Sequence, residues 1–264
     1  MNCFKTAPDF IKEDNRRFRP RNPITQEQMY NKHVALLPEA IIRGKSVLDL
    51  GCCIGATGHW CLSNGASHYT GIELQPEYVQ IAEKLLNKYH PGKFNIQQMA
   101  IEEWLNQPDK PSFDVVCLLG VIYIFVDYFS VLKLATDITR STLVIENCYA
   151  RILKKNPNYC GVEFMNDQTI NLSTETSSLI GRGTRITPNG LQWLMKSFSF
   201  TSNEGIIRPE PITGSPDVYN RPIDEMTEIY SARFLMRFVR TEVLVNSLSE
   251  NLKHRKGEKD PWIK

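Results

Sequence analysis

The sequence lacks any long apolar run. Across its 264 residues, no stretch approaches the roughly 20 apolar residues that a membrane-spanning helix needs. The first 20 residues are polar and rich in arginine, so they also lack the apolar centre of a secretory signal peptide. We therefore expect a cytoplasmic protein that has no membrane partner.

Neither sign of charge predominates. The 31 Lys and Arg residues stand against 29 Asp and Glu, and the net charge of +2 excludes an overall field that would make nucleic acid an obligatory partner. A basic surface would have to be local, and arginines at helical spacing more often lie on a solvated or ion-paired face. Two groups could form such a surface, one in an irregular N-terminal arm and one on a predicted C-terminal helix: Arg16, Arg17, Arg19 and Arg21, and Arg233, Arg237 and Arg240.

The cysteines show no spacing typical of a disulfide framework or a zinc site. There are seven, of which Cys52 and Cys53 are adjacent and the others are scattered. We expect reduced, mostly buried thiols and no metal. Internal repeats and low-complexity segments are also missing from the sequence.

The sequence does contain a regular alternation of strands and helices. Short apolar runs predict the strands, and apolar residues at helical spacing predict the helices between them. This order implies an α/β, Rossmann-like fold, in which helices flank a mostly parallel central sheet. The strands are predicted at 46–50, 68–73, 94–98, 113–119 and 142–146, and the helices at 55–62, from Pro76 onward, at 101–105 and at 128–139.

Other elements are predicted on either side of this alternation. A helical stretch at 25–42 precedes it, and a polar insertion at 147–185 follows it, with the length of a lid or binding loop. Thr187 and Pro188 are typical of the N-cap and first turn of a helix. A strand is predicted near 198–206, beyond that helix.

The turn after the first strand carries the chemistry. The strand ends at Gly51, and a second glycine, Gly55, opens the next helix, while Cys53 takes the place of the middle glycine of a dinucleotide-binding turn. Glu73 ends the second strand, where a carboxylate can accept the hydroxyls of a ribose. Asp49 would repel a pyrophosphate but suits an ammonium group. The pattern therefore favours S-adenosylmethionine, which has an ammonium group and no phosphate, as the cofactor.

Several motifs in register resemble the class I S-adenosylmethionine-dependent methyltransferases over residues 37–146. Leu48–Gly55 resembles their first motif, Tyr69–Leu74 their ribose-binding strand end, Phe94–Trp104 the next motif and Phe113–Tyr123 the fourth. The acidic residue that often meets the adenine amine is replaced here by Met99. The resemblance implies these cofactor-binding residues: Asp49, Gly51, Cys53, Gly55, Glu73, Leu74, Met99, Ala100, Leu119 and Gly120.

The resemblance also suggests how the chain is divided. We expect an N-terminal basic arm and helix at 1–36, and an S-adenosylmethionine-binding domain at 37–210 that includes the insertion 147–185. Residues 211–264 are expected to be a helical extension of the same unit, with a long amphipathic C-terminal helix at 221–252.

No catalytic residue follows from the chemistry, because methyl transfer from a sulfonium depends mainly on alignment and needs no dedicated base. Gly120–Tyr123 is similar to a short segment of the wobble-uridine tRNA methyltransferase and carboxymethyltransferase group, which makes Tyr123 the catalytic candidate. A tyrosine that simply packs its ring is an equally good interpretation. The Asp/Asn-Pro-Pro-Tyr signature of many amino-group methyltransferases is missing, which disfavours base nitrogens and glutamine amides as acceptors.

Glu146 and Asn147 resemble the acidic–Asn pair with which catechol-type O-methyltransferases hold magnesium. The fourth strand supplies no carboxylate to complete such a site, so we favour a hydrogen-bonding role for Glu146 at the end of its strand.

Three functions remain open at the level of sequence. The first is a methyltransferase that acts on a small-molecule acceptor. The second is a tRNA-modifying methyltransferase, suggested by the Tyr123 segment and the arginines. The third is a non-catalytic cofactor-binding or interaction module, suggested by the departures at Cys53 and Met99. The sequence indicates no oligomeric state.

Overall fold

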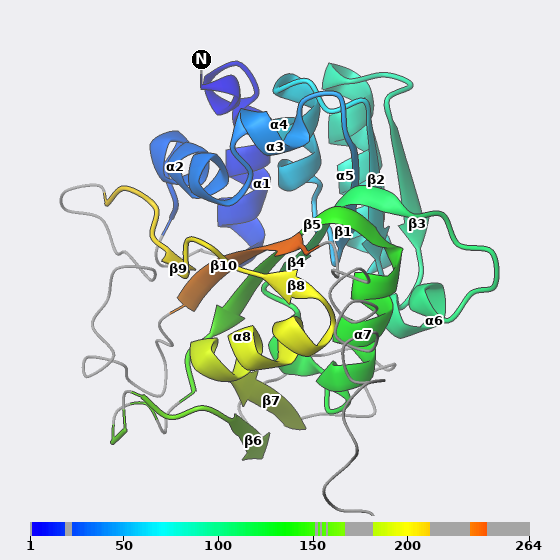
Figure 1. The fold of residues 1–264 in the computed structure, drawn as a ribbon. Coiled ribbons are helices and arrows are strands. Elements are labelled where there is room, and N and C mark those ends of the chain that lie inside the picture. Colours follow the sequence, from blue (N-terminus) through cyan, green and yellow to red (C-terminus); the bar gives the residue numbers. More distant parts are fainter. Residues whose placement is uncertain are drawn as a thin grey trace, which may run out of the picture.

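A twisted sheet forms the centre of the protein. The computed structural model describes residues 2–18, 23–150, 153, 155–156, 158–166, 182–211 and 233–241. Within these residues eight strands form one sheet in the order β3-β2-β1-β4-β5-β10-β8, with β9 also paired to β10 (Figure 1). Strands β1 to β5 are parallel, and β10 is antiparallel to each of its partners. The strands are β1 (Ser46–Leu50), β2 (His68–Glu73), β3 (Phe94–Gln98), β4 (Phe113–Leu119), β5 (Thr139–Cys148), β8 (Phe200–Thr201), β9 (Ile206–Ile207) and β10 (Arg233–Arg240).

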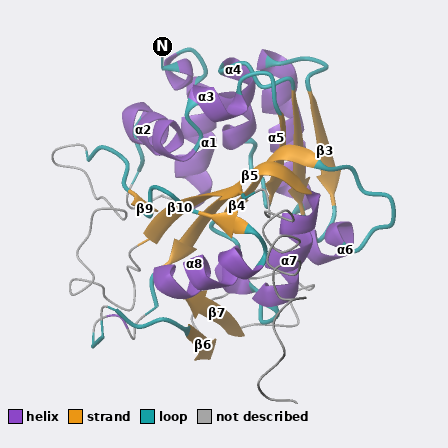
Figure 2. Ribbon diagram, viewed as in Figure 1, coloured by secondary structure: helices purple, strands orange, loops and turns teal. Residues whose placement is uncertain are grey.

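Helices cover both faces of this sheet (Figure 2). One group packs with a core that includes Val47 and Val144, and the other with a core that includes Leu48 and Ile145, so neighbouring residues of a strand face opposite layers. The first group is α1 (Pro8–Phe18), α2 (Gln26–Leu36), α3 (Glu39–Ile42), α4 (Ala56–Ser63) and α5 (Pro76–Tyr89); the second is α6 (Ile101–Leu105), α7 (Tyr128–Ile138) and α8 (Pro188–Ser197). Two 3₁₀ turns, η1 (Cys3–Lys5) and η2 (Ile122–Ile124), complete the helical elements.

The predicted α/β fold is confirmed, and most predicted bounds agree with the structure. The strand predicted at 142–146 extends over Thr139–Cys148, and the stretch predicted at 25–42 is two helices. A capping box begins α2. The Thr25 hydroxyl accepts from the backbone N–H of Gln28 at 3.1 Å, and the Gln28 side-chain oxygen accepts from the backbone N–H of Thr25 at 2.7 Å. Thr187 caps α8 as predicted.

Two predictions for the ends of the chain are wrong. The N-terminal arm is not irregular, because α1 spans Pro8–Phe18. Residues 233–240 are not helical but form β10, with Phe234, Met236 and Phe238 buried. The pairing of β10 with β5 over seven residue pairs overrides the arginine spacing that suggested a helix. The rest of the predicted helix, at 221–232 and 242–252, lies outside the described residues.

The insertion contains regular structure. Strands β6 (Val162–Asn166) and β7 (Arg182–Ile186) pair antiparallel, and the hairpin lies next to α8 (Figure 1). The Thr184 hydroxyl donates to the carbonyl of Phe125 at 2.8 Å and so fixes the hairpin to the loop after β4. The single strand predicted near 198–206 is two short strands, β8 and β9. None of the helices in the described part of the chain has the length and hydropathy needed to span a bilayer.

Candidate functional site

The turn between β1 and α4 brings left-handed backbone to the carboxyl edge of the sheet. Gly51, Cys53 and Gly55 have φ values of +85°, +52° and +78°. At Gly51 a Cβ atom would lie 2.5 Å from Cγ1 of Val121, so only glycine fits. The predicted glycine-punctuated turn is therefore a tight connection that leaves its backbone open to a ligand.

Cys53 has the backbone conformation of a glycine. A non-glycine residue in the left-handed region costs about 1–2 kcal/mol, so the turn keeps its shape at the expense of stability. We expect Cys53→Gly to raise the free energy of unfolding by about 0.5–1 kcal/mol, since the strain removed exceeds the entropy that glycine adds to the unfolded chain. Urea denaturation measures the change.

Cys52→Gly is the matched control, because Cys52 is buried and its φ is not positive. That variant is expected to lose stability. An equal loss in both variants would contradict the assignment of strain to Cys53.

Asp49 is buried beneath this turn, with 1% of its surface exposed. Its Oδ2 accepts a hydrogen bond from the Tyr69 hydroxyl at 2.8 Å, whereas its Oδ1 has no hydrogen-bond partner. Burial raises the pKa of Asp49 to about 6, although the Tyr69 hydrogen bond and the charge of Lys32 oppose the rise. An unpaired buried carboxylate oxygen is costly, and a positively charged ligand group would satisfy it.

A cavity of about 110 Å³ opens beside Asp49. This volume is below the roughly 300–1,000 Å³ of whole ligand pockets, so it matches one end of a nucleoside cofactor. The N-terminal helices line it through Asp14, Lys32 and His33, while Leu119 closes it from β4. Burial lowers the pKa of His33 to about 3, so its ring is neutral at pH 7. Sequence reasoning missed these three N-terminal residues, because their position depends on tertiary packing alone.

Glu73 ends β2 on the other side of the turn. Its Oε2 accepts from the backbone N–H of Cys53 and its Oε1 from that of Gln75, both at 2.9 Å. Burial raises the pKa of Glu73, against these hydrogen bonds. Because each carboxylate oxygen has more than one acceptor position, the side chain is held rigidly and can still receive hydroxyl groups. Leu74 follows it in the chain.

The remaining predicted cofactor residues lie at neighbouring strand ends. The Met99 backbone N–H donates to the carbonyl of Glu73 at 3.0 Å, so the end of β3 lies against the end of β2. Ala100 is the N-cap residue of α6. Gly120, at φ +74°, donates its N–H to the carbonyl of Glu146 at 3.1 Å. The structure thus brings the predicted residues to one edge, although only four of them line the small cavity: Asp49, Gly51, Cys53 and Leu119.

Glu146 forms the centre of a charged cluster at the end of β5. Its side chain is 1% exposed, with Lys32 Nζ at 2.7 Å from Oε2 and Arg233 paired to Oε1. Burial alone would raise the pKa of Glu146, but the two cations hold it well below its usual range. The Arg233 guanidinium also lies 5.8 Å from the centre of the Tyr123 ring.

Tyr123 is half-buried beside this cluster. Burial raises the pKa of its hydroxyl, although Arg233 opposes the rise, so the phenol stays protonated at neutral pH. The carboxylate of Glu146 is occupied by two cationic side chains, and the described residues contain no group of three His, Cys, Asp or Glu side chains placed to hold a metal ion.

The arginines that suggested a nucleic-acid surface are engaged within the protein. Arg16 pairs with Glu13 at 2.9 Å, and Arg17 pairs with Glu77 at 2.5 Å. Arg240 donates to the carbonyl of Thr139 at 2.9 Å. The predicted helical geometry of the second group is therefore wrong, whereas the ion pairing expected of such arginines is present at Arg233 and Arg237. Arg19 and Arg21 lie outside the described residues.

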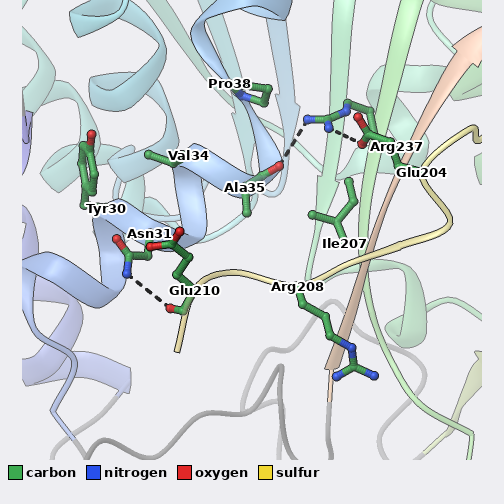
Figure 3. A pocket seen from close by; sticks show the side chains of 10 residues that line it. All are labelled: Tyr30, Asn31, Val34, Ala35, Pro38, Glu204, Ile207, Arg208, Glu210 and Arg237. Atoms are coloured by element: carbon green, nitrogen blue, oxygen red, sulfur yellow. Dashed lines mark hydrogen bonds and ion pairs between the residues drawn. The ribbon is translucent and has the colours of Figure 1, made fainter. Parts of the chain in front are cut away.

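Arg237 belongs to a second, larger cavity of about 540 Å³ (Figure 3). It donates to the carbonyls of Ala35 and Leu36 at 3.2 and 3.3 Å and pairs with Glu204. Val34 lines this cavity, while Lys32 and His33 of the same helix line the small one. No predicted cofactor residue lines the larger cavity.

Comparison with known proteins identifies the central part of the chain. Residues 47–142 match a family model described as "Methyltransferase domain". An uncharacterized protein of Haemophilus influenzae is 33% identical over 99 residues, which make up 36% of this chain and 38% of that protein. The chain thus matches less than half the length of this relative.

Solved structures extend the likeness to the whole fold. A methyltransferase of Mesorhizobium loti, described as S-adenosylmethionine dependent, has a TM-score of 0.56 at 15% identity, covering 80% of this chain and 97% of that one. The magnesium protoporphyrin IX methyltransferase of Synechocystis, solved with S-adenosylhomocysteine, has a TM-score of 0.55 at 12% identity. The match covers 90% of this chain and 99% of that one. A chain from a Haloferax volcanii complex with the Trm112 methyltransferase activator has a TM-score of 0.56 at 17% identity. The match covers 90% of this chain and 96% of that one. The predicted resemblance is confirmed at the level of the fold.

Proposed function

We propose that the protein binds S-adenosylmethionine and transfers its methyl group to a small-molecule acceptor, because residues 47–142 match a methyltransferase family model and the chain has the fold of class I methyltransferases. The observation that carries the proposal is the unpaired Oδ1 of Asp49, which is buried and borders the small cavity. It fits the ammonium group of a methionine moiety, which supplies both a hydrogen-bond donor and a positive charge, and an anionic ligand end would leave it unsatisfied.

The other predicted residues fit the rest of this cofactor. Glu73 would receive the ribose hydroxyls, and Met99 and Ala100 would offer an apolar contact and a backbone N–H to the adenine. When bound, the cofactor supplies an electrophilic methyl group on a sulfonium. The neighbour from Synechocystis was solved with the demethylated product of this cofactor, which supports the same assignment here.

The chain contributes positioning to the reaction. Transfer of that methyl group would be a displacement in which a bond from the acceptor replaces the carbon–sulfur bond, and any proton displaced from the acceptor would pass to solvent. Such a displacement gains most from alignment of the acceptor. Gly120 and Tyr123 lie in the segment that follows β4, where the acceptor would lie, and residues of α1 and α2 line the cavity at Asp49. Tyr123 remains a proposed positioning residue.

A small acceptor is favoured over tRNA because the described arginines that supported an RNA surface form ion pairs or hydrogen bonds with other residues of the chain. A non-catalytic module is disfavoured because the departure at Cys53 keeps a left-handed φ of +52° and with it the shape of the turn. The porphyrin acceptor in the name of one neighbour belongs to that protein, yet it agrees with a small-molecule substrate.

Calorimetric titration with S-adenosylmethionine and S-adenosylhomocysteine, with NAD as the control, tests the proposal. We expect the first two ligands to bind with dissociation constants of roughly micromolar order, which correspond to a binding free energy of about 8 kcal/mol. We expect NAD not to bind. The assigned cofactor would be contradicted if NAD bound, or if none of the three ligands bound.

A further inference from the structure

The small cavity beside Asp49 is lined by charges of both signs. Asp14 and Asp49 contribute carboxylates, and Lys32 contributes an ammonium group from α2. His33 also lines the cavity, but burial lowers its pKa to about 3, so its ring is neutral at pH 7. Lys32 is therefore the one cation among the described residues of this lining. A ligand end that complements both signs carries an ammonium and a carboxylate together, as an α-amino acid does.

Lys32 is held at the wall of the cavity by a buried carboxylate. Its Nζ lies 2.7 Å from Oε2 of Glu146, and its side chain is 18% exposed. The pKa of Glu146 is held well below its usual range, so this carboxylate is ionised and favours the charged form of Lys32. Because an ammonium group can donate to more than one acceptor at once, the ion pair with Glu146 positions Lys32 without excluding a ligand carboxylate.

Helix α2, which carries Lys32, is fixed at both ends. The capping box at Thr25 begins it. Near its other end, Arg237 donates to the carbonyls of Ala35 and Leu36 at 3.2 and 3.3 Å. The wall that presents Lys32 to the cavity is therefore formed before a ligand arrives, which lowers the cost of binding.

From these observations we propose that Lys32 binds the α-carboxylate of the cofactor's methionine moiety, so that the cavity recognises both charges of an amino acid. This inference rests on the proposed function and deepens it, because it assigns the cofactor contact opposite Asp49. Asp14 and Asp49 would repel an anion that arrives without an ammonium group. Lys32 lies outside residues 47–142, which match the family model, so the N-terminal helices take part in selecting the cofactor.

Titration calorimetry with S-adenosylmethionine and with decarboxylated S-adenosylmethionine tests the inference, since the second ligand keeps the ammonium group and lacks the carboxylate. The wild-type protein is expected to bind the intact cofactor about tenfold to a hundredfold more tightly, as for a charge-assisted hydrogen bond. Lys32→Gln should lose most of this preference, because its affinity falls for the intact cofactor and does not fall for the decarboxylated one. Lys32→Arg, which keeps the charge, is expected to retain part of the preference.

Arg233→Gln is the matched control. It removes the other cation that pairs with Glu146, and Arg233 lines neither of the two cavities described above. This variant should keep the wild-type preference, and an equal loss in Arg233→Gln and Lys32→Gln would overturn the inference.

Two further results would overturn the inference and leave the cofactor assignment standing. One is a wild-type protein that binds S-adenosylmethionine without preferring it to the decarboxylated ligand, a comparison that decides the matter even if Lys32→Gln does not fold. The other is a full preference in Lys32→Gln. Failure of the wild-type protein to bind either ligand would overturn both proposals.

Discussion

Replacing Asp49 with asparagine is expected to lower the affinity for S-adenosylmethionine about tenfold to a hundredfold. The variant keeps the shape of the side chain and an oxygen for the Tyr69 hydroxyl, but it removes the charge that would meet the cofactor's ammonium group. A hydrogen bond that involves a charge contributes about 1.5–3 kcal/mol, which corresponds to this range. Titration calorimetry on both proteins measures the change.

The same substitution is expected to stabilise the cofactor-free protein at pH 7. Burial raises the pKa of Asp49 from 3.8 to about 6. Ionising this carboxyl therefore costs more free energy in the folded state than in the unfolded state. This cost lowers the free energy of unfolding progressively as the pH rises from about 4 to 6, and it reaches its full value above pH 6. It amounts to about 3 kcal/mol, which Asp49→Asn removes. The gain should disappear below about pH 4, where both states are protonated.

Cofactor binding to the wild-type protein should therefore weaken as the pH falls through about 6. Asp114→Asn is the control, since Asp114 begins β4 at the opposite edge of the sheet and accepts from the backbone N–H of Ser46 at 2.9 Å. An affinity that is unchanged in Asp49→Asn, or reduced as much in Asp114→Asn, would remove Asp49 from the site.

Replacing Glu146 with glutamine is expected to give the largest loss of stability, about 3–5 kcal/mol. The change is nearly isosteric, but it leaves Lys32 and Arg233 without their shared counter-charge in a buried cluster. The two cations lower the pKa of Glu146 in the folded state. The ionised Glu146 therefore contributes fully to the free energy of unfolding above the pKa that it has in the unfolded chain. This contribution is lost as the pH falls toward its lower pKa in the folded protein.

Urea denaturation at pH 7 and again in acid measures this difference, which should shrink in acid. Asp137→Asn is the control, because its ion pair with Lys133 joins two half-exposed side chains and should contribute less than about 0.5 kcal/mol. Equal losses in the two variants would show that the cluster around Glu146 is no more important than a surface pair.

The parallel core could be predicted from the sequence because its signals are local. Strands such as Ser46–Leu50 and Phe113–Leu119 are short, mostly apolar runs between turns, and the structure has them at the predicted residues. Asp49, Gly51 and Glu73 could be predicted as site residues for the same reason, since each lies at or beside the end of a strand that has a local signal.

The rest of the site depends on contacts between distant parts of the chain. Lys32 and Arg233 meet at Glu146 only in the folded protein, and no local pattern indicates either ion pair. Arg233–Arg240 carries arginines at a spacing that suits a helix, but the open edge of β5 supplies hydrogen bonds that only a strand can use. The prediction of a C-terminal helix failed over 233–240 because pairing across the sheet outweighs local preference.

The position of β10 also affects how the protein is made. Arg237 reaches the end of α2 across 202 residues of sequence, and Arg233 reaches Glu146 across 87. Chains emerge from the ribosome from the N-terminus, and contacts between distant residues form late. The cofactor end of the site can therefore assemble on a nascent chain, but the buried carboxylate of Glu146 receives its second cation only after β10 has been synthesised. A chain released before that point would have a methyltransferase core whose acceptor end is incomplete.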